Sequence, residues 1–160
     1  MTEEQLFVHV YESDIFKKWH WFRYHFELKL RGANHPFSEG ILQARLDCER
    51  RIPGFAAGMI DAIASISGRE KDRRQYEQLM ARLAELLVIR HAVNYPWPFH
   101  AGFRWEPTAA GSKKNPELMV TGGLMTFGVE VRGYPECTSD ANLFGTGGCA
   151  ASAHSGRSHA

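Results

Sequence analysis

Two glutamates and an arginine lie within apolar runs in the stretch KKNPELMVTGGLMTFGVEVRGY, Lys113 to Tyr134. Glu117 precedes a Gly-Gly pair, and Glu130 and Arg132 follow it. Two carboxylates placed close together repel each other, and a divalent cation removes that repulsion. Mg²⁺ suits such a pair, because it binds through one or two carboxylates and keeps several waters. These residue types therefore predict metal-ion chemistry, provided that the fold brings them together.

The Gly-Gly pair predicts a two-residue hairpin turn at Gly122 and Gly123, which places Glu117 opposite Gly128. Because side chains alternate between the faces of a strand, Glu117, Glu130 and Arg132 then share one face. Glu130 becomes the diagonal neighbour of Glu117, with backbones about 7–8 Å apart. The opposite face is apolar and is expected to face the core. It consists of Leu118, Val120, Met125, Phe127, Val129 and Val131.

An ordinary exposed hairpin explains the same spacing. In that alternative both glutamates are solvated, and Arg132 pairs with one of them. Register decides between the two interpretations, since a slip of one residue would turn Glu130 into the core.

Helices are expected before the hairpin. Apolar residues recur with a period near 3.6 in the first and last of these segments, and Pro53-Gly54 separates the middle two. Pro36 excludes His35 from helical conformation, and Ser38 is the expected cap of the second helix. The expected helical segments are residues 3–30, 41–52, 55–67 and 68–93, and the expected strands are residues 99–107, 116–121 and 124–133.

This order predicts an α/β chain of the α+β kind with three parts. Residues 1–67 form a helical N-terminal region, and residues 68–133 form a core of one helix followed by three strands. Residues 134–160 are rich in Gly, Ala and Ser, and such a low-complexity tail is expected to be disordered.

The core motif resembles the PD-(D/E)XK nuclease superfamily, the restriction-endonuclease-like proteins. The matching residues are Pro116-Glu117 at the start of one strand and Glu130-Val131-Arg132 in the next. A preceding helix that carries a glutamate belongs to the same pattern, and Glu85 occupies the matching position. The resemblance covers residues 69–133 and implies metal-dependent cleavage of phosphodiester bonds in nucleic acid, with DNA as the expected partner.

The resemblance also implies roles for individual residues. Glu117 and Glu130 would hold Mg²⁺ or Mn²⁺ with the backbone carbonyl of Val131, and Glu85 would orient a bound water or a second ion. The alternative for Glu85 is an exposed helix glutamate. Arg132 stands where the family has a lysine, and a guanidinium does not accept protons at neutral pH. Lys113 and Lys114 are the neighbouring lysines that could replace it.

The family core continues with another helix and strand, which the Gly/Ala/Ser tail does not supply. A truncated or degenerate member is therefore expected, with an open sheet edge that a second copy or a partner covers. Two further functions remain open. One is a catalytically inactive relative that binds nucleic acid or protein, and the other is a helical protein-interaction module in which the hairpin is structural.

The amino-acid composition excludes few functions. Of the 160 residues 44% are hydrophobic, and the net charge of +1 indicates no general attraction to nucleic acid. Three cysteines without a CxxC pair indicate neither zinc nor a disulfide framework. The acidic N-terminus lacks the features of a signal peptide, and no apolar run is long enough to span a bilayer. The chain is therefore expected to be cytoplasmic and not to be bound to a membrane.

Two other stretches carry aromatic or basic residues. WHWFRYHF, Trp19 to Phe26, has the spacing of a buried helix face, and base stacking is its alternative function, with Lys17, Lys18 and Arg23 as the nearby cations. REKDRRQ, Arg69 to Gln75, mixes charges of both signs and is expected to begin a solvated helix.

Overall fold

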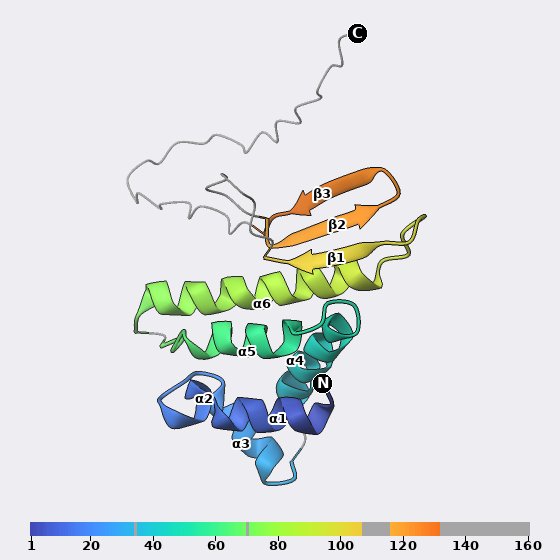
Figure 1. Cartoon of the computed structure of the whole chain (residues 1–160). Coiled ribbons are helices and arrows are strands. Elements are labelled where there is room, and N and C mark those ends of the chain that lie inside the picture. Colours follow the sequence, from blue (N-terminus) through green and yellow to red (C-terminus); the bar gives the residue numbers. More distant parts are fainter. Residues whose placement is uncertain (34, 70, 107–115, 132–160) are drawn as a thin grey trace, which may run out of the picture.

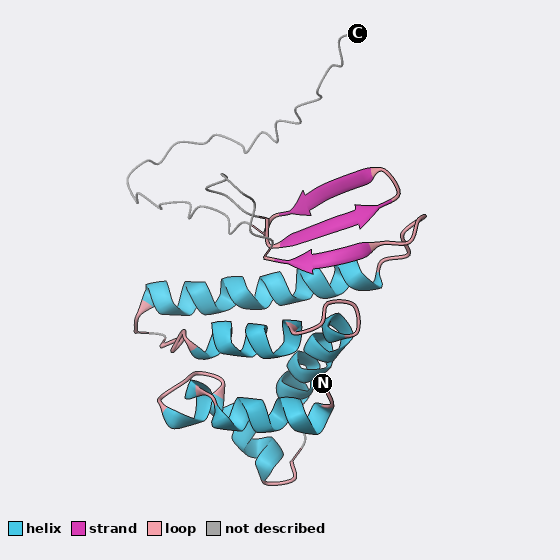
Figure 2. Ribbon diagram, viewed as in Figure 1, coloured by secondary structure: helices cyan, strands magenta, loops and turns pink. Residues whose placement is uncertain are grey.

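A computed structural model describes residues 1–33, 35–69, 71–106 and 116–131. These residues form a helical part and a small antiparallel sheet, so the fold is α+β as predicted (Figures 1 and 2). Arg132, Lys113, Lys114 and the predicted tail lie outside the described residues. The elements are α1 (Glu3–Glu12), α2 (Asp14–Lys17), α3 (Arg23–Leu30), α4 (Pro36–Glu49), α5 (Phe55–Ala64), α6 (Arg73–Asn94), β1 (Gly102–Trp105), β2 (Leu118–Gly122) and β3 (Met125–Val129).

The expected helix over residues 3–30 is divided into α1, α2 and α3. Thr2 and Gln5 form a capping box that starts α1, and Ser13 both ends α1 and caps α2. The apolar spacing continues through these breaks, because Leu6, Ile15 and Phe26 are all buried. Spacing alone therefore predicted most of the buried face, but it wrongly included Trp19, which is 50% exposed, and it did not predict the ends of the helices.

Helix α4 begins earlier than predicted. Its cap is His35, whose backbone is extended, as Pro36 requires, and whose Nδ1 accepts a hydrogen bond from the amide of Phe37. The prediction of Ser38 as the cap was wrong. Ser38 is buried within the first turn of α4, and its hydroxyl donates to the carbonyl of His35 over 3.0 Å.

Helix α6 lies between α5 and the sheet and follows the predicted long amphipathic segment (Figure 1). Asp72 caps its N-terminus by accepting a hydrogen bond from the amide of Gln75. One hydrophobic core joins the helices to the sheet. Its members from α6 and β2 include Leu79, Leu86, Ile89, Val93, Leu118 and Val120. No helix among the described residues is long and apolar enough to cross a membrane.

The strands pair in the order β1-β2-β3, and the hairpin forms where it was predicted. The predicted register was wrong, because Gly122 pairs with Met125 and the turn residues are Gly123 and Leu124. Gly123 has a φ of 58°, as a type II′ turn requires at its first central residue. Gly122 is needed for space instead, since a Cβ there would lie 2.0 Å from Cδ2 of Phe99.

This shift moves Gly128 opposite Met119, whereas the predicted register had placed it opposite Glu117. It leaves the faces of the strands unchanged, because the pairing moves by two residues. The prediction that the whole apolar face meets the core was also wrong. Leu118 and Val120 are buried, but Met125 is 57% exposed, because β3 lies farthest from the helices (Figure 1).

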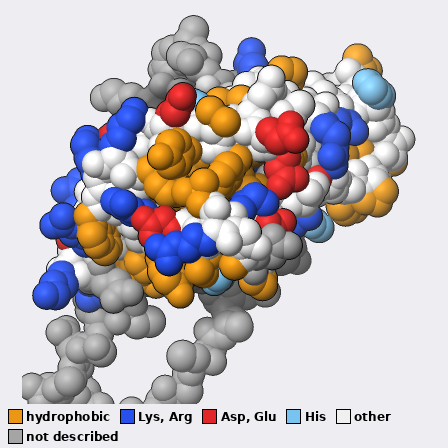
Figure 3. Space-filling model, turned by 90° about the horizontal axis from the view of Figure 1, so that it is seen from below, with side chains coloured by type: hydrophobic (Ala, Val, Ile, Leu, Met, Phe, Trp, Pro, Cys, Tyr) orange, Lys and Arg blue, Asp and Glu red, His pale blue; other side chains and the backbone are white. Residues whose placement is uncertain are grey.

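Hydrophobic side chains are also exposed on the opposite side of the molecule. Figure 3 views the face formed by α1, α2 and α3, where a band of hydrophobic side chains lies between charged groups. Tyr11 and Leu30 are half-exposed there and line a shallow hollow together with Phe16. Two acids and three bases line it, so the hollow has no dominant sign of charge.

Arg45 is a charged residue inside the helical core. Its side chain is 0% exposed, and none of its three guanidinium nitrogens has a hydrogen-bond partner among the described residues. Burial lowers the pKa of Arg45 to about 9. A cation that loses its hydration without gaining acceptors opposes folding.

We therefore expect Arg45→Met to stabilise the protein. The methionine keeps an unbranched stem and removes the desolvated donors, which should raise the free energy of unfolding by about 1–3 kcal/mol in urea denaturation. Arg31→Met, at an exposed position of the same charge, should change it by less than about 0.5 kcal/mol. A large loss of stability in Arg45→Met would contradict this account.

His20 fixes the segment between α2 and α3. Its Nδ1 accepts a hydrogen bond from the amide of Phe22, so its Nε2 must carry the proton that it shares with the carbonyl of Ile63. The ring is 4% exposed. Burial lowers the pKa of His20 below its usual value of 6.5, although the carbonyls of Ile63 and Ile66 act in the opposite direction.

This lowered pKa predicts a loss of stability in acid. Below pH 6.5 the unfolded chain binds a proton at His20 that the folded chain excludes, so the free energy of unfolding should fall as the pH drops from about 7.5 to 5. His20→Gln should show a smaller fall, whereas His100→Gln, at an exposed position, should match the wild type. Urea denaturation across this pH range measures the difference, and equal slopes in all three proteins would refute the prediction.

Candidate functional site

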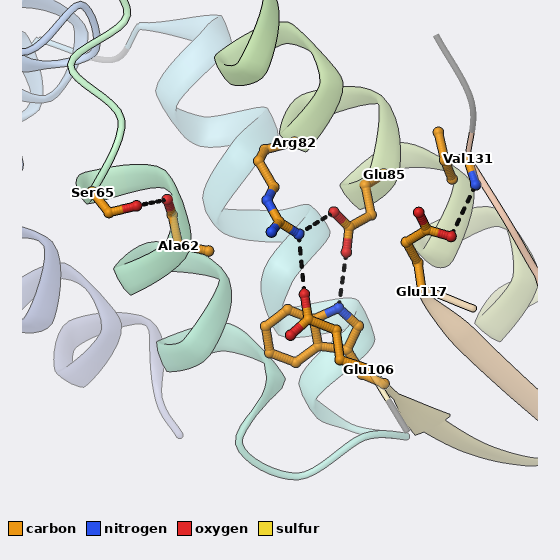
Figure 4. A network of polar contacts seen from close by, with 8 residues as sticks. Ala62, Ser65, Arg82, Glu85, Glu106, Glu117 and Val131 are labelled. Carbon is orange, nitrogen blue, oxygen red and sulfur yellow. Dashed lines mark hydrogen bonds and ion pairs between the residues drawn. The ribbon is translucent and has the colours of Figure 1, made fainter. Parts of the chain in front are cut away.

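A hollow of about 380 Å³ opens between the first half of α6 and the ends of β2 and β3. We call it the acid hollow, because two of the glutamates predicted from the sequence line it. Its lining residues are Ile66, Gln78, Ala81, Arg82, Glu85, Glu117 and Val131. The structure thus brings Glu85 of α6 together with Glu117, which directly precedes β2, as Figure 4 shows from close by.

Glu85 is buried, with 4% of its surface exposed. Its Oε2 accepts a hydrogen bond from Nη1 of Arg82 over 2.6 Å, and its Oε1 accepts one from the indole nitrogen of Trp105 over 2.9 Å. Both carboxylate oxygens are therefore engaged. The alternative of an exposed helix glutamate was wrong, because Trp105 of β1 reaches over the helix at this point.

Arg82 lies between two acids. The Nη1 that contacts Glu85 also lies 3.1 Å from Oε1 of Glu106, just beyond β1 (Figure 4). Burial alone would lower the pKa of Arg82, but the two carboxylates outweigh it and raise that pKa. Glu106 has a φ of 42°, a left-handed backbone that non-glycine residues adopt at a cost.

Glu117 is half-buried at the edge of the acid hollow. Its Oε2 accepts a hydrogen bond from the amide of Val131 over 3.0 Å (Figure 4). Its own carbonyl accepts one from the amide of Glu106 over 2.9 Å. Glu117 therefore links β2 to both neighbouring strands, at the end of the sheet away from the turn.

Glu130 is exposed and is not among the residues that line the acid hollow. The ladder ends with the pair Leu118–Val129, so Glu117 and Glu130 are the next residues outward on adjacent strands. The observed register thus places Glu117 and Glu130 directly opposite each other across the two strands, whereas the predicted register made them diagonal neighbours. Arg132, the third residue of the predicted set, lies outside the described residues.

The oxygen donors match Mg²⁺ in chemical type, since the ion prefers carboxylates and water. Within the described part of the chain, however, no three His, Cys, Asp or Glu side chains come close enough together to hold a metal ion. Glu85 is held by Arg82 and Trp105 and Glu117 by the amide of Val131, and pairing of the strands makes Glu117 and Glu130 the adjacent carboxylates of the predicted set.

Arg82, Trp105 and Glu106 were not predicted as residues of the site. Arg82 could have been found, because it precedes Glu85 by three residues, the spacing at which helical side chains meet. Trp105 and Glu106 depend on how β1 packs against α6, which the local sequence does not encode.

Comparison of the chain with protein-family models, with curated proteins and with solved structures finds no match.

The contacts of Glu85 predict a structural role that can be measured. Glu85→Ala leaves the half-buried indole N–H of Trp105 without its acceptor and the half-buried guanidinium of Arg82 with Glu106 alone, and should lower the free energy of unfolding by about 1–3 kcal/mol in urea denaturation. Glu77→Ala removes an exposed ion pair with Arg73 on the same helix and should cost less than about 1 kcal/mol. Equal losses in the two variants would exclude a structural role for Glu85.

Proposed function

We propose that this protein is a metal-dependent nuclease-like enzyme that hydrolyses phosphodiester bonds of DNA. One observation carries the proposal: Glu117, which directly precedes β2, lines one hollow with Arg82 and Glu85 of α6. The order of helix, three-stranded meander and acid-bearing hairpin agrees with the restriction-endonuclease-like core that the motif Pro116-Glu117…Glu130-Val131-Arg132 implies.

In this proposal Glu117 and Glu130 hold Mg²⁺ or Mn²⁺ with the carbonyl of Val131. When bound, the ion supplies Lewis acidity toward the phosphate and lowers the pKa of a water. Two adjacent carboxylates also gain from the ion, because it removes their mutual repulsion.

The chain's own residues position the substrate. Arg82 presents a guanidinium at the acid hollow, and guanidinium groups bind phosphate oxygens with two parallel hydrogen bonds. Glu85 and Glu106 fix the position of Arg82, so Glu85 acts through Arg82 instead of as a ligand of the ion. In this proposal Glu85 thus has another role than the orientation of a bound water or a second ion, which the family resemblance implied.

A second function is favoured by the same contacts. Both carboxylate oxygens of Glu85 accept hydrogen bonds, and Glu117 accepts one from a backbone amide. These carboxylates are therefore satisfied by protein donors without a metal ion. A catalytically inactive relative that binds nucleic acid would show these features and would retain the hollow as a structural junction.

Cleavage of supercoiled plasmid in Mg²⁺ or Mn²⁺ tests the proposal. Wild-type protein should nick the plasmid, and Glu117→Gln and Glu130→Gln should each lower the rate by about 10- to 100-fold or more, because each removes a charged ligand. Glu4→Gln, an exposed acid on α1, is the matched control and should retain full activity.

The two functions give different results. Equal cleavage by wild type and Glu130→Gln would reject the metal site, since a contaminating nuclease would behave in that way. The inactive relative predicts that the wild type does not cleave plasmid at any concentration of either metal. It also predicts that calorimetry detects no Mg²⁺ binding that depends on Glu117.

A further inference from the structure

Two stretches that are far apart in the sequence meet at the N-terminal end of α6. Trp19 and Trp21 precede α3, and Arg69 and Lys71 precede α6. These residues line a hollow of about 380 Å³, which we call the aromatic–basic platform. Trp19 is 50% exposed, and the guanidinium carbon of Arg69 lies 5.3 Å from the centre of its ring. Half of a large indole thus faces solvent beside a cation.

The backbone beneath the platform is tightly held. The amide of Trp21 donates to the carbonyl of Ser67 over 3.1 Å. Gly68, with a φ of 67°, fits closely between Trp21 and Leu79, because a Cβ there would lie 2.3 Å from Cδ2 of Leu79. The buried ring of His20 anchors the segment from the other side. An exposed indole held in this way loses little conformational entropy when it binds a ligand.

Among the described residues around the platform, positive charges outnumber negative ones. Asp72 accepts the amide of Gln75 at the start of α6, and Arg73 pairs with Glu77 over 2.8 Å. Arg69, Lys71 and Arg74 are exposed, and none of them forms an ion pair with another described residue. The N-terminus of α6 adds partial positive charge at the same place.

A polar stripe connects the platform with the acid hollow. Arg74, Gln78 and Arg82 follow one another at intervals of four residues on one face of α6, and Gln78 and Arg82 line the acid hollow. Arg74 and Arg82 are separated by about 12 Å along the helix axis, at 1.5 Å per residue. That is the length of roughly three to four nucleotides at the 3.4 Å spacing of one stacked strand.

We propose that the aromatic–basic platform binds single-stranded nucleic acid. A base stacks on the exposed indole of Trp19, and Arg69, Lys71 and Arg74 contact the phosphates. Exposed aromatic rings beside cations suit a single strand, because only unpaired bases offer their faces for stacking. The strand then follows α6 toward the acid hollow. This direction rests on the proposed function, whereas binding at the platform does not.

Fluorescence polarisation with a fluorescein-labelled 12-nucleotide oligo(dT) in EDTA and 50 mM salt tests the platform without catalysis. Trp19→Ala should weaken binding about 10-fold, within the range measured for loss of one base–aromatic stack. Tyr24→Ala removes another exposed aromatic ring from the same stretch of sequence and should bind like the wild type. Circular dichroism verifies that each variant is folded.

A second variant tests the phosphate contacts. In Arg69→Gln/Lys71→Gln, the slope of log Kd against log salt should become shallower by about 0.7 for each phosphate contact that is lost. A 12-base-pair duplex should bind more weakly than the single strand and should be insensitive to Trp19→Ala. Unchanged affinity in Trp19→Ala, or no binding of oligo(dT) by the wild type, would overturn the proposal.

Failure of the platform can be distinguished from failure of the nuclease. Glu117→Gln and Glu130→Gln should bind oligo(dT) in EDTA as tightly as the wild type. If the protein binds oligo(dT) but does not cleave plasmid, binding at the platform is supported and the proposed nuclease activity is contradicted. If Trp19→Ala changes neither metal-dependent cleavage nor the affinity for oligo(dT), the proposed nuclease activity is supported and binding at the platform is contradicted.

Discussion

The buried carboxylate of Glu85 holds the sheet against the helices. It binds the indole nitrogen of Trp105 from β1, while the ring of Trp105 packs against Phe55 of α5 with centroids 4.9 Å apart. Gly58 allows this approach, since a Cβ there would lie 2.6 Å from the indole. One aromatic side chain is thus held by two helices. The position of the sheet, and with it the acid hollow, depends on this contact.

The sequence predicted elements better than their boundaries. Periodicity identified α6, and β-prone residues around a glycine turn identified β2 and β3, although only β2 alternates buried residues with more exposed ones. Periodicity could not separate α1, α2 and α3, whose buried residues continue the same spacing across Ser13. The hairpin turn was displaced by one residue because two glycines had different roles. Gly123 supplies the positive φ, and Gly122 leaves room for Phe99.

The candidate site was predicted in part for a similar reason. The positions of Glu85 and Glu117 follow from the order of elements, which the sequence encodes locally. Their partners follow only in part, since Arg82 is three residues from Glu85 on α6, whereas Trp105 and Glu106 reach this pair through the packing of β1 against the helix. The meeting of Trp19 with Arg69 was also unpredictable, because 49 residues separate them and only the packing around Gly68 brings them together. Long-range packing decides which polar groups meet.

Strand β3 has a consequence for how the protein behaves at high concentration. It is an edge of the described sheet, and the segment Met125–Val129 contains neither a charged residue nor a proline. Natural edge strands normally carry such groups to discourage intermolecular pairing. An edge strand without such groups, and with Met125 and Phe127 exposed, can pair with the same strand of a second molecule. Solubility would then be limited by this strand well before the global fold is lost.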